Sequence, residues 1–126
     1  MTHDTTIFLV DDDTAVRDSL KLLLETHGLA VRDFASGAQL LQESAPRPGD
    51  CLVCDVHMPV MSGLEIVETL TRRGIASPAI LITGRADEAL RRRARAAGAF
   101  LLIEKPFDGD LLVDAIDRAL NAGSPS

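Results

Sequence analysis

Short runs of apolar residues recur along the chain, and each is followed by polar residues or by a residue that interrupts regular structure. The runs are Ile7–Val10, Ala30–Phe34, Cys51–Cys54, Ala79–Ile82 and Phe100–Ile103. Four or five residues is the length of a buried strand rather than of a helix. Arg32 and Asp33 interrupt the second run, and this alternation indicates an edge strand with one solvated side. The pattern therefore predicts five strands.

The segments between these runs carry apolar residues at helical spacing, with capping residues before them and glycine after several of them. Asp13 or Thr14 would cap the first helix, and Ser62-Gly63-Leu64-Glu65 has the form of a capping box. The pattern predicts helices over about 15–27, 36–43, 62–73, 87–97 and 110–121, and a tail at 122–126.

Strands that alternate with helices over short connections form a parallel sheet covered on both faces. Since such crossovers are right-handed, the sheet must be doubly wound. With the weak second strand at one edge, the expected order is 2-1-3-4-5, which is a (βα)5 flavodoxin-like α/β fold. We expect one domain over residues 1–126, with its core at about 7–120.

Composition and charge limit the classes of function. The 126 residues are 46% apolar, which is enough for one buried core, and the net charge of −6 argues against general binding to nucleic acid or to anionic membranes. No apolar run approaches the roughly 20 residues of a membrane span. The amino terminus lacks the basic and apolar regions of a signal peptide. We therefore expect a cytoplasmic protein.

The two cysteines form a C-x-x-C pair at Cys51 and Cys54. Redox or metal chemistry would need both thiols on the same face. Residues three apart on a strand point to opposite faces of the sheet. We therefore expect both cysteines to be small buried hydrophobic residues.

Residues that can carry chemistry follow four of the predicted strands. They are Asp11-Asp12-Asp13, Asp55, Thr83-Gly84 and Glu104-Lys105-Pro106. The carboxyl ends of parallel strands lie along one edge of the sheet, and ligands bind there. Carboxylates brought together in this way repel each other, and a divalent cation would remove the conflict. Mg²⁺, which takes oxygen ligands and keeps several waters, suits Asp11 or Asp12 together with Asp55.

Lys105 adds a mobile positive charge suited to phosphate, and Thr83 adds a hydroxyl at the same edge. A cis bond before Pro106 would turn the chain and help to aim the lysine. A metal, an amine and a hydroxyl around one carboxylate suit phosphoryl transfer, which depends on positioning and charge neutralisation. Asp55 is then the nucleophile that forms an aspartyl phosphate. Singly, each residue has a structural explanation, such as a helix cap for Asp13.

These motifs resemble those of the receiver domains of two-component response regulators. The matching segments are V-D-D-D at 10–13, D-V-H-M-P-V-M-S-G at 55–63, I-T-G at 82–84 and E-K-P-F at 104–107. The last two are most similar to the FixJ-type branch, and the resemblance covers about 7–120. It implies that a sensor histidine kinase or a phosphotransfer protein donates a phosphoryl group to Asp55.

The resemblance also implies a role for each matched residue. Thr83 would swing toward the phosphoryl group and Lys105 would bind it, reshaping the face made by the fourth helix, the fifth strand and the last helix. Such a protein is not an enzyme beyond catalysing its own phosphorylation and dephosphorylation. The ligands of Mg²⁺ would be Asp11, Asp12, Asp55 and the backbone carbonyl of His57.

The chain departs from the family pattern at two points. Receiver domains usually carry Tyr or Phe three residues before the lysine, and here that position is Leu102, with Phe100 two residues earlier and expected on the same strand face. Switching would then run through the backbone and the fourth helix. In addition, no output domain follows the last predicted helix. The chain is either a stand-alone receiver or a part of a longer regulator.

Charge is distributed unevenly between the last two helices. The fourth helix and its approach carry Arg85, Arg91, Arg92, Arg93 and Arg95, whereas the last helix carries Asp110, Asp114 and Asp117. A solvated face with scattered ion pairs is the simpler interpretation. The alternative is a docking surface for an acidic partner or for a second copy, giving a homodimer. We expect no direct DNA binding and no membrane contact.

Two other functions remain open at this stage. Asp11-Asp12-Asp13-Thr14 is similar to the D-x-D-x-T motif of haloacid-dehalogenase-like phosphohydrolases, although the chain is short for that fold and has no obvious cap segment. The third interpretation is an interaction module that works without phosphorylation. The intact set of acids, hydroxyl and lysine argues against it.

Overall fold

Strands and helices alternate along the chain in the computed structural model, which describes residues 5–43 and 45–122. The strands are β1 (Thr6–Val10), β2 (Ala30–Phe34), β3 (Cys51–Asp55), β4 (Ala79–Thr83) and β5 (Leu101–Glu104). The helices are α1 (Thr14–Thr26), α2 (Gly37–Glu43), α3 (Gly63–Arg72), α4 (Glu88–Ala97) and α5 (Gly109–Ala122). The alternation predicted from the sequence is confirmed.

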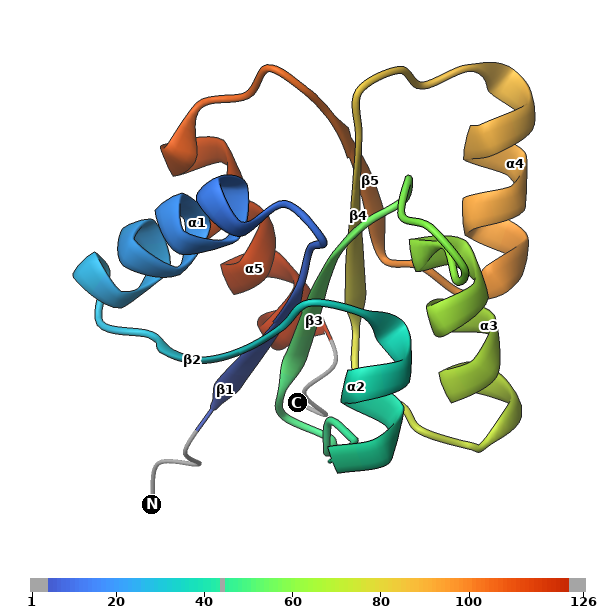
Figure 1. The fold of residues 1–126 in the computed structure, drawn as a ribbon, viewed down its shortest axis with the longest axis horizontal. Coiled ribbons are helices and arrows are strands. Elements are labelled where there is room, and N and C mark those ends of the chain that lie inside the picture. Colours follow the sequence, from blue (N-terminus) through green and yellow to red (C-terminus); the bar gives the residue numbers. More distant parts are fainter. Residues whose placement is uncertain (1–4, 44, 123–126) are drawn as a thin grey trace.

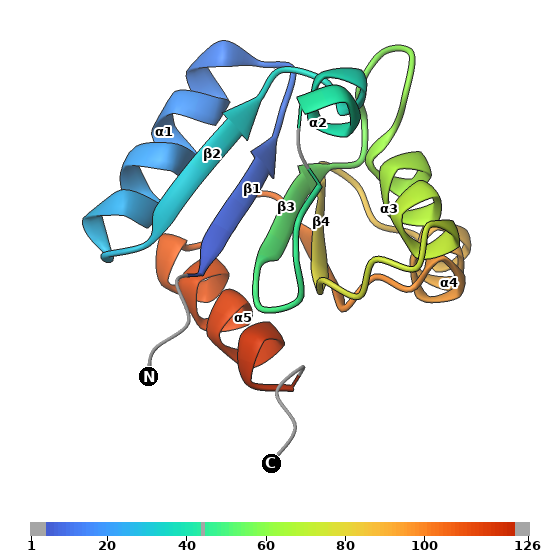
Figure 2. The ribbon, with the colours of Figure 1, turned by 90° about the horizontal axis from the view of Figure 1, so that it is seen from below.

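All five strands pair in parallel, in the order β2-β1-β3-β4-β5. This is the predicted order, with β2 at one edge. Helices α1 and α5 cover one face of the sheet and α2, α3 and α4 cover the other (Figures 1 and 2). Because the chain winds outward from β1 to β2 and then crosses back past β1 to β3, the carboxyl ends of β1 and β3 lie next to each other at the switch point.

The sheet separates two apolar cores, and the two cysteines lie in different ones. Cys54 packs with residues of α2, α3 and α4, whereas Cys51 packs with residues of α1 and α5. Burial raises the pKa of the Cys51 thiol to about 12, and it raises that of the Cys54 thiol well above its usual value. Both thiols are protonated at neutral pH and point to opposite faces, as predicted, so they do not form a redox or metal pair.

The helix ends follow the predicted chemistry closely. Asp13 caps α1 by accepting a hydrogen bond from the N–H of Val16, and Ser62 forms a complete capping box with Glu65 at the start of α3. Gly28 takes the left-handed conformation expected after a helix, with φ of 83°. Local side-chain hydrogen bonds therefore fix where these helices begin, which is why their sequence signals are reliable.

Some boundaries differ from the prediction. The β4–β5 ladder begins with Ile80 opposite Leu101, so Phe100 lies just before the strand and is 39% exposed. Helix α5 includes Ala122, which the sequence assigned to the tail. The rest of the predicted tail, at 123–126, lies outside the described residues. Within the described ranges, no helix is long and apolar enough to cross a lipid bilayer.

A buried carboxylate, that of Asp50, holds the amino-terminal end of β1 in place, at the opposite end of this strand from Asp11. Asp50 is 1% exposed, and its two carboxylate oxygens accept hydrogen bonds of 2.9 Å from the backbone N–H groups of Thr6 and Arg47. These bonds hold the start of β1 against the loop that precedes β3. The two bonds satisfy backbone donors that would otherwise lack a partner in the folded chain.

We expect Asp50→Ala to lower the free energy of unfolding by about 2–4 kcal/mol, because it leaves two backbone donors without their acceptor. Urea unfolding followed by far-ultraviolet circular dichroism measures this, since the chain has no Trp or Tyr to report by fluorescence. Asp117→Ala, at an exposed position on α5, is the control and should change stability by less than about 0.5 kcal/mol. Equal effects of the two substitutions would contradict the anchoring role.

Candidate functional site

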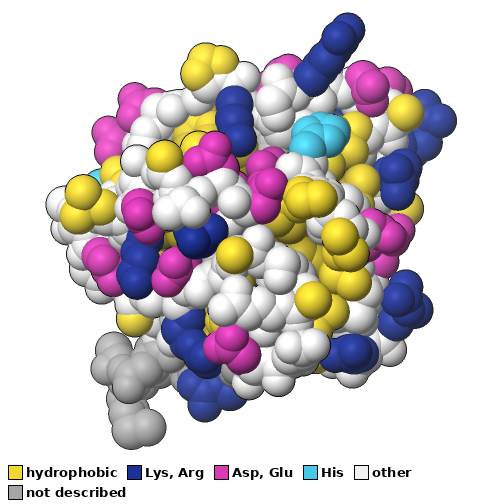
Figure 3. Space-filling model, in the orientation of Figure 1, with side chains coloured by type: hydrophobic (Ala, Val, Ile, Leu, Met, Phe, Trp, Pro, Cys, Tyr) yellow, Lys and Arg dark blue, Asp and Glu magenta, His cyan; other side chains and the backbone are white. Residues whose placement is uncertain are grey.

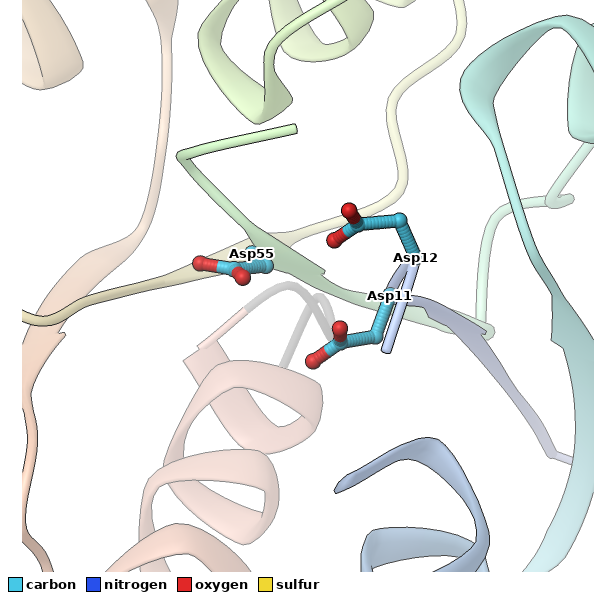
Figure 4. A group of neighbouring side chains, drawn as sticks. All are labelled: Asp11, Asp12 and Asp55. Carbon is cyan, nitrogen blue, oxygen red and sulfur yellow. The ribbon is translucent and has the colours of Figure 1, made fainter. Parts of the chain in front are cut away.

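Three carboxylates meet at the switch point of the sheet. Asp11 and Asp12 follow β1, and Asp55 ends β3, the strand that pairs with β1. One carboxylate oxygen from each residue lies within 4.8 Å of the corresponding oxygens of the other two. Figure 4 shows the three side chains side by side at the ends of their strands. The fold thus brings together the acids that the sequence placed at this edge.

The electrostatics of this cluster are unfavourable without a cation. Burial raises the pKa of Asp11, which is 3% exposed, and the charges of Asp55 and Asp12 raise it further. A hydrogen bond of 2.9 Å from the N–H of Asp13 and the charge of Lys105 act in the opposite direction, but the pKa remains above its usual value. The three clustered carboxylates offer oxygen ligands, which fit a divalent cation and Mg²⁺ in particular.

Lys105 lies beside the carboxylate of Asp55. Its Nζ is 3.8 Å from Asp55 Oδ2, and the two side chains are 37% and 12% exposed. At that distance the contact is an ion pair rather than a hydrogen bond, so the lysine acts through its charge. The peptide between Lys105 and Pro106 is cis. The backbone N–H of Lys105 also donates to the carbonyl of Thr83, so β5 carries the lysine to the end of β4.

Thr83 ends β4 and is fully buried. Its hydroxyl donates to the carbonyl of Arg85 at 3.0 Å and accepts from the N–H of Arg85 at 3.2 Å. The Nε2 atom of His57 lies 3.1 Å from the same oxygen. Within residues 5–43 and 45–122, no hydrogen bond joins this hydroxyl to Asp55. The Thr83 hydroxyl is therefore bonded to Arg85 and His57 rather than to the carboxylate of Asp55.

The loop between β3 and α3 passes close to Asp55. A Cβ atom on Gly63 would collide with the backbone carbonyl of Asp55, and the N–H of Gly63 donates to the carbonyl of Val56 at 3.0 Å. Val60, at the exposed tip of the loop, has φ of 70°, which is strained for a β-branched residue. Only glycine allows α3 to begin this close to the strand, which accounts for the last residue of the D-V-H-M-P-V-M-S-G motif.

Sequence reasoning missed one residue that supports the acidic cluster. Arg17 on α1 donates from Nη1 to the backbone carbonyl of Asp11 at 2.7 Å and from Nε to Asp33 at 3.2 Å. Lys21 also contacts Asp33, at 3.1 Å. Burial raises the pKa of Asp33, but its bonds to Lys21 and Arg17 outweigh burial and lower it below the usual value. The guanidinium thereby ties the end of β1 to β2.

Leu102, where the chain departs from the family pattern, lies with Phe100 between α4 and β5. Leu102 is half-buried, and with Phe100 and Leu101 it borders a hollow of about 270 Å³ whose other side carries Arg91 and Arg95. Phe100 was predicted to lie on the strand, on the same face as Leu102. It instead precedes β5, because the residues at 98–100 form the turn that leaves α4.

Comparison with known proteins agrees with this geometry. Residues 7–117 match the family model of the response regulator receiver domain. The transcriptional regulatory protein FixJ of Azorhizobium caulinodans is 40% identical over 120 residues, which are 95% of this chain and 57% of that protein. DctR of Rhodobacter capsulatus, a transcriptional regulatory protein of C4-dicarboxylate transport, is 40% identical over 119 residues, which are 93% of this chain and 60% of that protein.

The chain belongs to the response regulator receiver domains. The crystal structure of FixJ-N is 36% identical, with a TM-score of 0.83, and covers 95% of this chain and 96% of that one. The response regulator StyR is 38% identical, with a TM-score of 0.87, and covers 96% of this chain and 61% of that one. The likeness to FixJ-type regulators is confirmed. The chain spans less than two thirds of the length of the curated regulators reported above. Membership of the receiver family implies, in general, a histidine kinase as partner.

We expect Asp11→Asn to raise the melting temperature of the Mg²⁺-free receiver domain at pH 7. The folded-state pKa of Asp11 lies above its unfolded value, so the ionised group costs stability at every pH above the raised pKa. The cost fades as the pH falls through that pKa, and the wild type should approach the variant there. Differential scanning calorimetry across pH measures this.

The same substitution should remove most of the stabilisation that excess Mg²⁺ gives the wild type. Asp18→Asn, at an exposed position on α1, is the matched control and should leave both the melting temperature and the response to Mg²⁺ unchanged. A variant at Asp11 that is less stable than the wild type and still responds fully to Mg²⁺ would contradict the interpretation.

Proposed function

We propose that the receiver domain accepts a phosphoryl group on Asp55 and thereby acts as a phosphorylation-controlled switch in a two-component phosphorelay. The observation that carries the proposal is the meeting of three carboxylates with Lys105 at the carboxyl ends of β1, β3 and β5. Neither a solvated surface nor a structural ion pair requires three carboxylates to converge in this way. The donor is a sensor histidine kinase or a phosphotransfer protein in the cytoplasm.

In the transfer, a carboxylate oxygen of Asp55 attacks the phosphorus, and the bond between phosphorus and the histidine nitrogen of the donor breaks. The nitrogen leaves with the electron pair and takes up a proton, so the donor returns as neutral histidine and Asp55 becomes an acyl phosphate. Lys105, 3.8 Å from Asp55, is placed to pair with a phosphoryl oxygen. The domain turns over no other substrate, so it is not an enzyme in the usual sense.

Mg²⁺, when bound, would neutralise charge on the phosphoryl oxygens. Asp11 carries its carboxylate into the cluster on a backbone fixed by Arg17, and Asp12 presents its carboxylate beside it from an exposed position. The backbone carbonyl of His57 completes the proposed set of protein ligands. The N–H of the same residue faces Asp55 Oδ1 at 3.4 Å, which keeps the loop close to the acceptor. The proposed ligands are Asp11, Asp12, Asp55 and the His57 carbonyl.

Phosphorylation would bias a two-state equilibrium through Thr83. The hydroxyl is held by Arg85 and His57, and a phosphoryl group on Asp55 would offer it a charged acceptor instead. Moving the hydroxyl releases the backbone at Arg85, which leads into α4. The change would reach the face formed by α4, β5 and α5 without rotation of an aromatic ring at position 102.

Incubation with Mg²⁺ and acetyl phosphate should add the mass of one phosphoryl group to the wild type, as measured by intact mass spectrometry. Asp55→Asn should abolish the addition, because an amide is not a nucleophile of this kind. Lys105→Met should slow it about 100-fold, the usual effect of losing one charged group at a transition state.

Two outcomes would contradict the proposal. Label that persists in Asp55→Asn would place the acceptor elsewhere. Steady turnover of a phosphate ester that is lost in Asp11→Asn and kept in Asp55→Asn would favour the phosphohydrolase interpretation, in which the nucleophile is on β1.

We further propose that the activated domain forms a homodimer through the face made by α4, β5 and α5. Positive side chains gather over α4 on the side of the molecule that Figure 3 presents. Among the arginines of this helix, all of which the structure describes, only Arg95 forms an ion pair, with Glu88 of the same helix at 3.9 Å. The exposed acids of α5 offer the complementary charge. The residues concerned are Arg91, Arg92, Arg93, Arg95, Asp110, Asp114 and Asp117.

Sedimentation equilibrium in Mg²⁺ and beryllofluoride tests this. We expect Arg91→Glu to weaken self-association at least about tenfold, because it sets like charges against each other across the interface. Arg73→Glu, at the far end of α3, is the charge-matched control and should leave the association constant unchanged. An activated wild type that stays monomeric at all accessible concentrations would rule out this dimer.

A further inference from the structure

The hydroxyl of Thr83 uses all of its hydrogen-bonding capacity in this structure. A hydroxyl has one donor and two acceptor positions. The proton goes to the carbonyl of Arg85, and one lone pair takes the N–H of the same residue. The second lone pair is left for the Nε2 atom of His57, 3.1 Å away, which must then carry its proton. Each of the three bonds holds the hydroxyl where it is.

Two of these bonds involve the backbone of Arg85 and would form with any residue except proline at position 85. The third comes from a side chain, that of His57, and therefore depends on the identity of one residue. The histidine lies two positions after Asp55, on the loop that follows β3, whereas Thr83 ends β4. The bond thus links the loop that carries the acceptor to the residue proposed to respond to phosphorylation.

The side chain and the backbone of His57 have separate tasks in this arrangement. In the proposed function, the backbone carbonyl is a ligand of Mg²⁺. The imidazole ring reaches instead to Thr83. Substitution of the side chain leaves the carbonyl in place. Its effects on the threonine are therefore measurable apart from effects on metal binding.

We propose that the His57 side chain is a positioning residue that holds the Thr83 hydroxyl away from Asp55, and so favours the resting state of the switch. This inference rests on the proposed function, in which the hydroxyl must move toward a phosphoryl group on Asp55. The move requires the hydroxyl to leave His57 and Arg85. The imidazole stabilises only the state before that move, and a contact made in one state alone shifts the equilibrium between the two.

Beryllofluoride, which stands in for the phosphoryl group on Asp55, provides the test. With saturating Mg²⁺, His57→Ala should bind beryllofluoride about three- to tenfold more tightly than the wild type by isothermal titration calorimetry, the factor expected for one hydrogen bond lost from the resting state. Its affinity for Mg²⁺ alone should be unchanged. In two-dimensional NMR, the Thr83 methyl signal of the variant should lie closer to its beryllofluoride-bound position even before the anion is added.

Two further variants separate this role from a general loosening of the loop. His57→Gln keeps an N–H donor of similar reach and should restore most of the wild-type affinity and methyl shift. In a Thr83→Ala background, substitution of His57 should no longer alter beryllofluoride affinity, because the oxygen it bonds is absent. The double-mutant cycle isolates the contact itself.

The outcomes distinguish this inference from the function on which it rests. If the wild type binds no beryllofluoride in the presence of Mg²⁺, the proposed function fails. If the wild type binds it and His57→Ala binds it equally or more weakly, the proposed function stands and the positioning role is overturned. An effect of His57→Ala that persists in full without the Thr83 hydroxyl would also overturn it.

Discussion

Mutual repulsion among Asp11, Asp12 and Asp55 is the constraint on which the rest of this structure depends. A folded chain gains stability by keeping such groups apart, yet here parallel pairing of β1 and β3 forces them together. Burial makes the conflict worse, since it raises the pKa of Asp11. The two apolar cores on either side of the sheet supply the stability that tolerates this arrangement. The same conflict makes the cluster ready for a cation and for a phosphoryl group.

The elements around the cluster work mainly as supports. Gly63 lets α3 start against the carbonyl of Asp55, and Arg17 fixes the backbone of Asp11 from the other side. Their effect is to make the positions of the carboxylates rigid, which matters because phosphoryl transfer depends on positioning more than on any covalent work by the protein.

In the proposed function, switching depends on a competition for the hydroxyl of Thr83. In the structure, hydrogen bonds with the backbone of Arg85 and the side chain of His57 hold the hydroxyl of Thr83. A charged phosphoryl oxygen is a stronger acceptor than a neutral carbonyl. Phosphorylation of Asp55 would therefore draw the Thr83 hydroxyl away from Arg85 and His57. Leu102, where receiver domains usually carry an aromatic ring, leaves a hollow beside α4. The backbone from Thr83 to α4 is then the direct physical route from the acceptor to the outer face.

The sequence by itself determined the strand and helix alternation, the sheet order and the acids, hydroxyl and lysine at one edge. These follow from local patterns, from handedness and from the shared direction of parallel strands, so no coordinates were needed. Only the tertiary structure decided that His57 bonds Thr83, that Arg17 bonds Asp11, and that Phe100 stands before β5 rather than on it. His57 and Thr83 are 26 positions apart in sequence, and both side-chain bonds depend on side-chain directions that no local periodicity encodes.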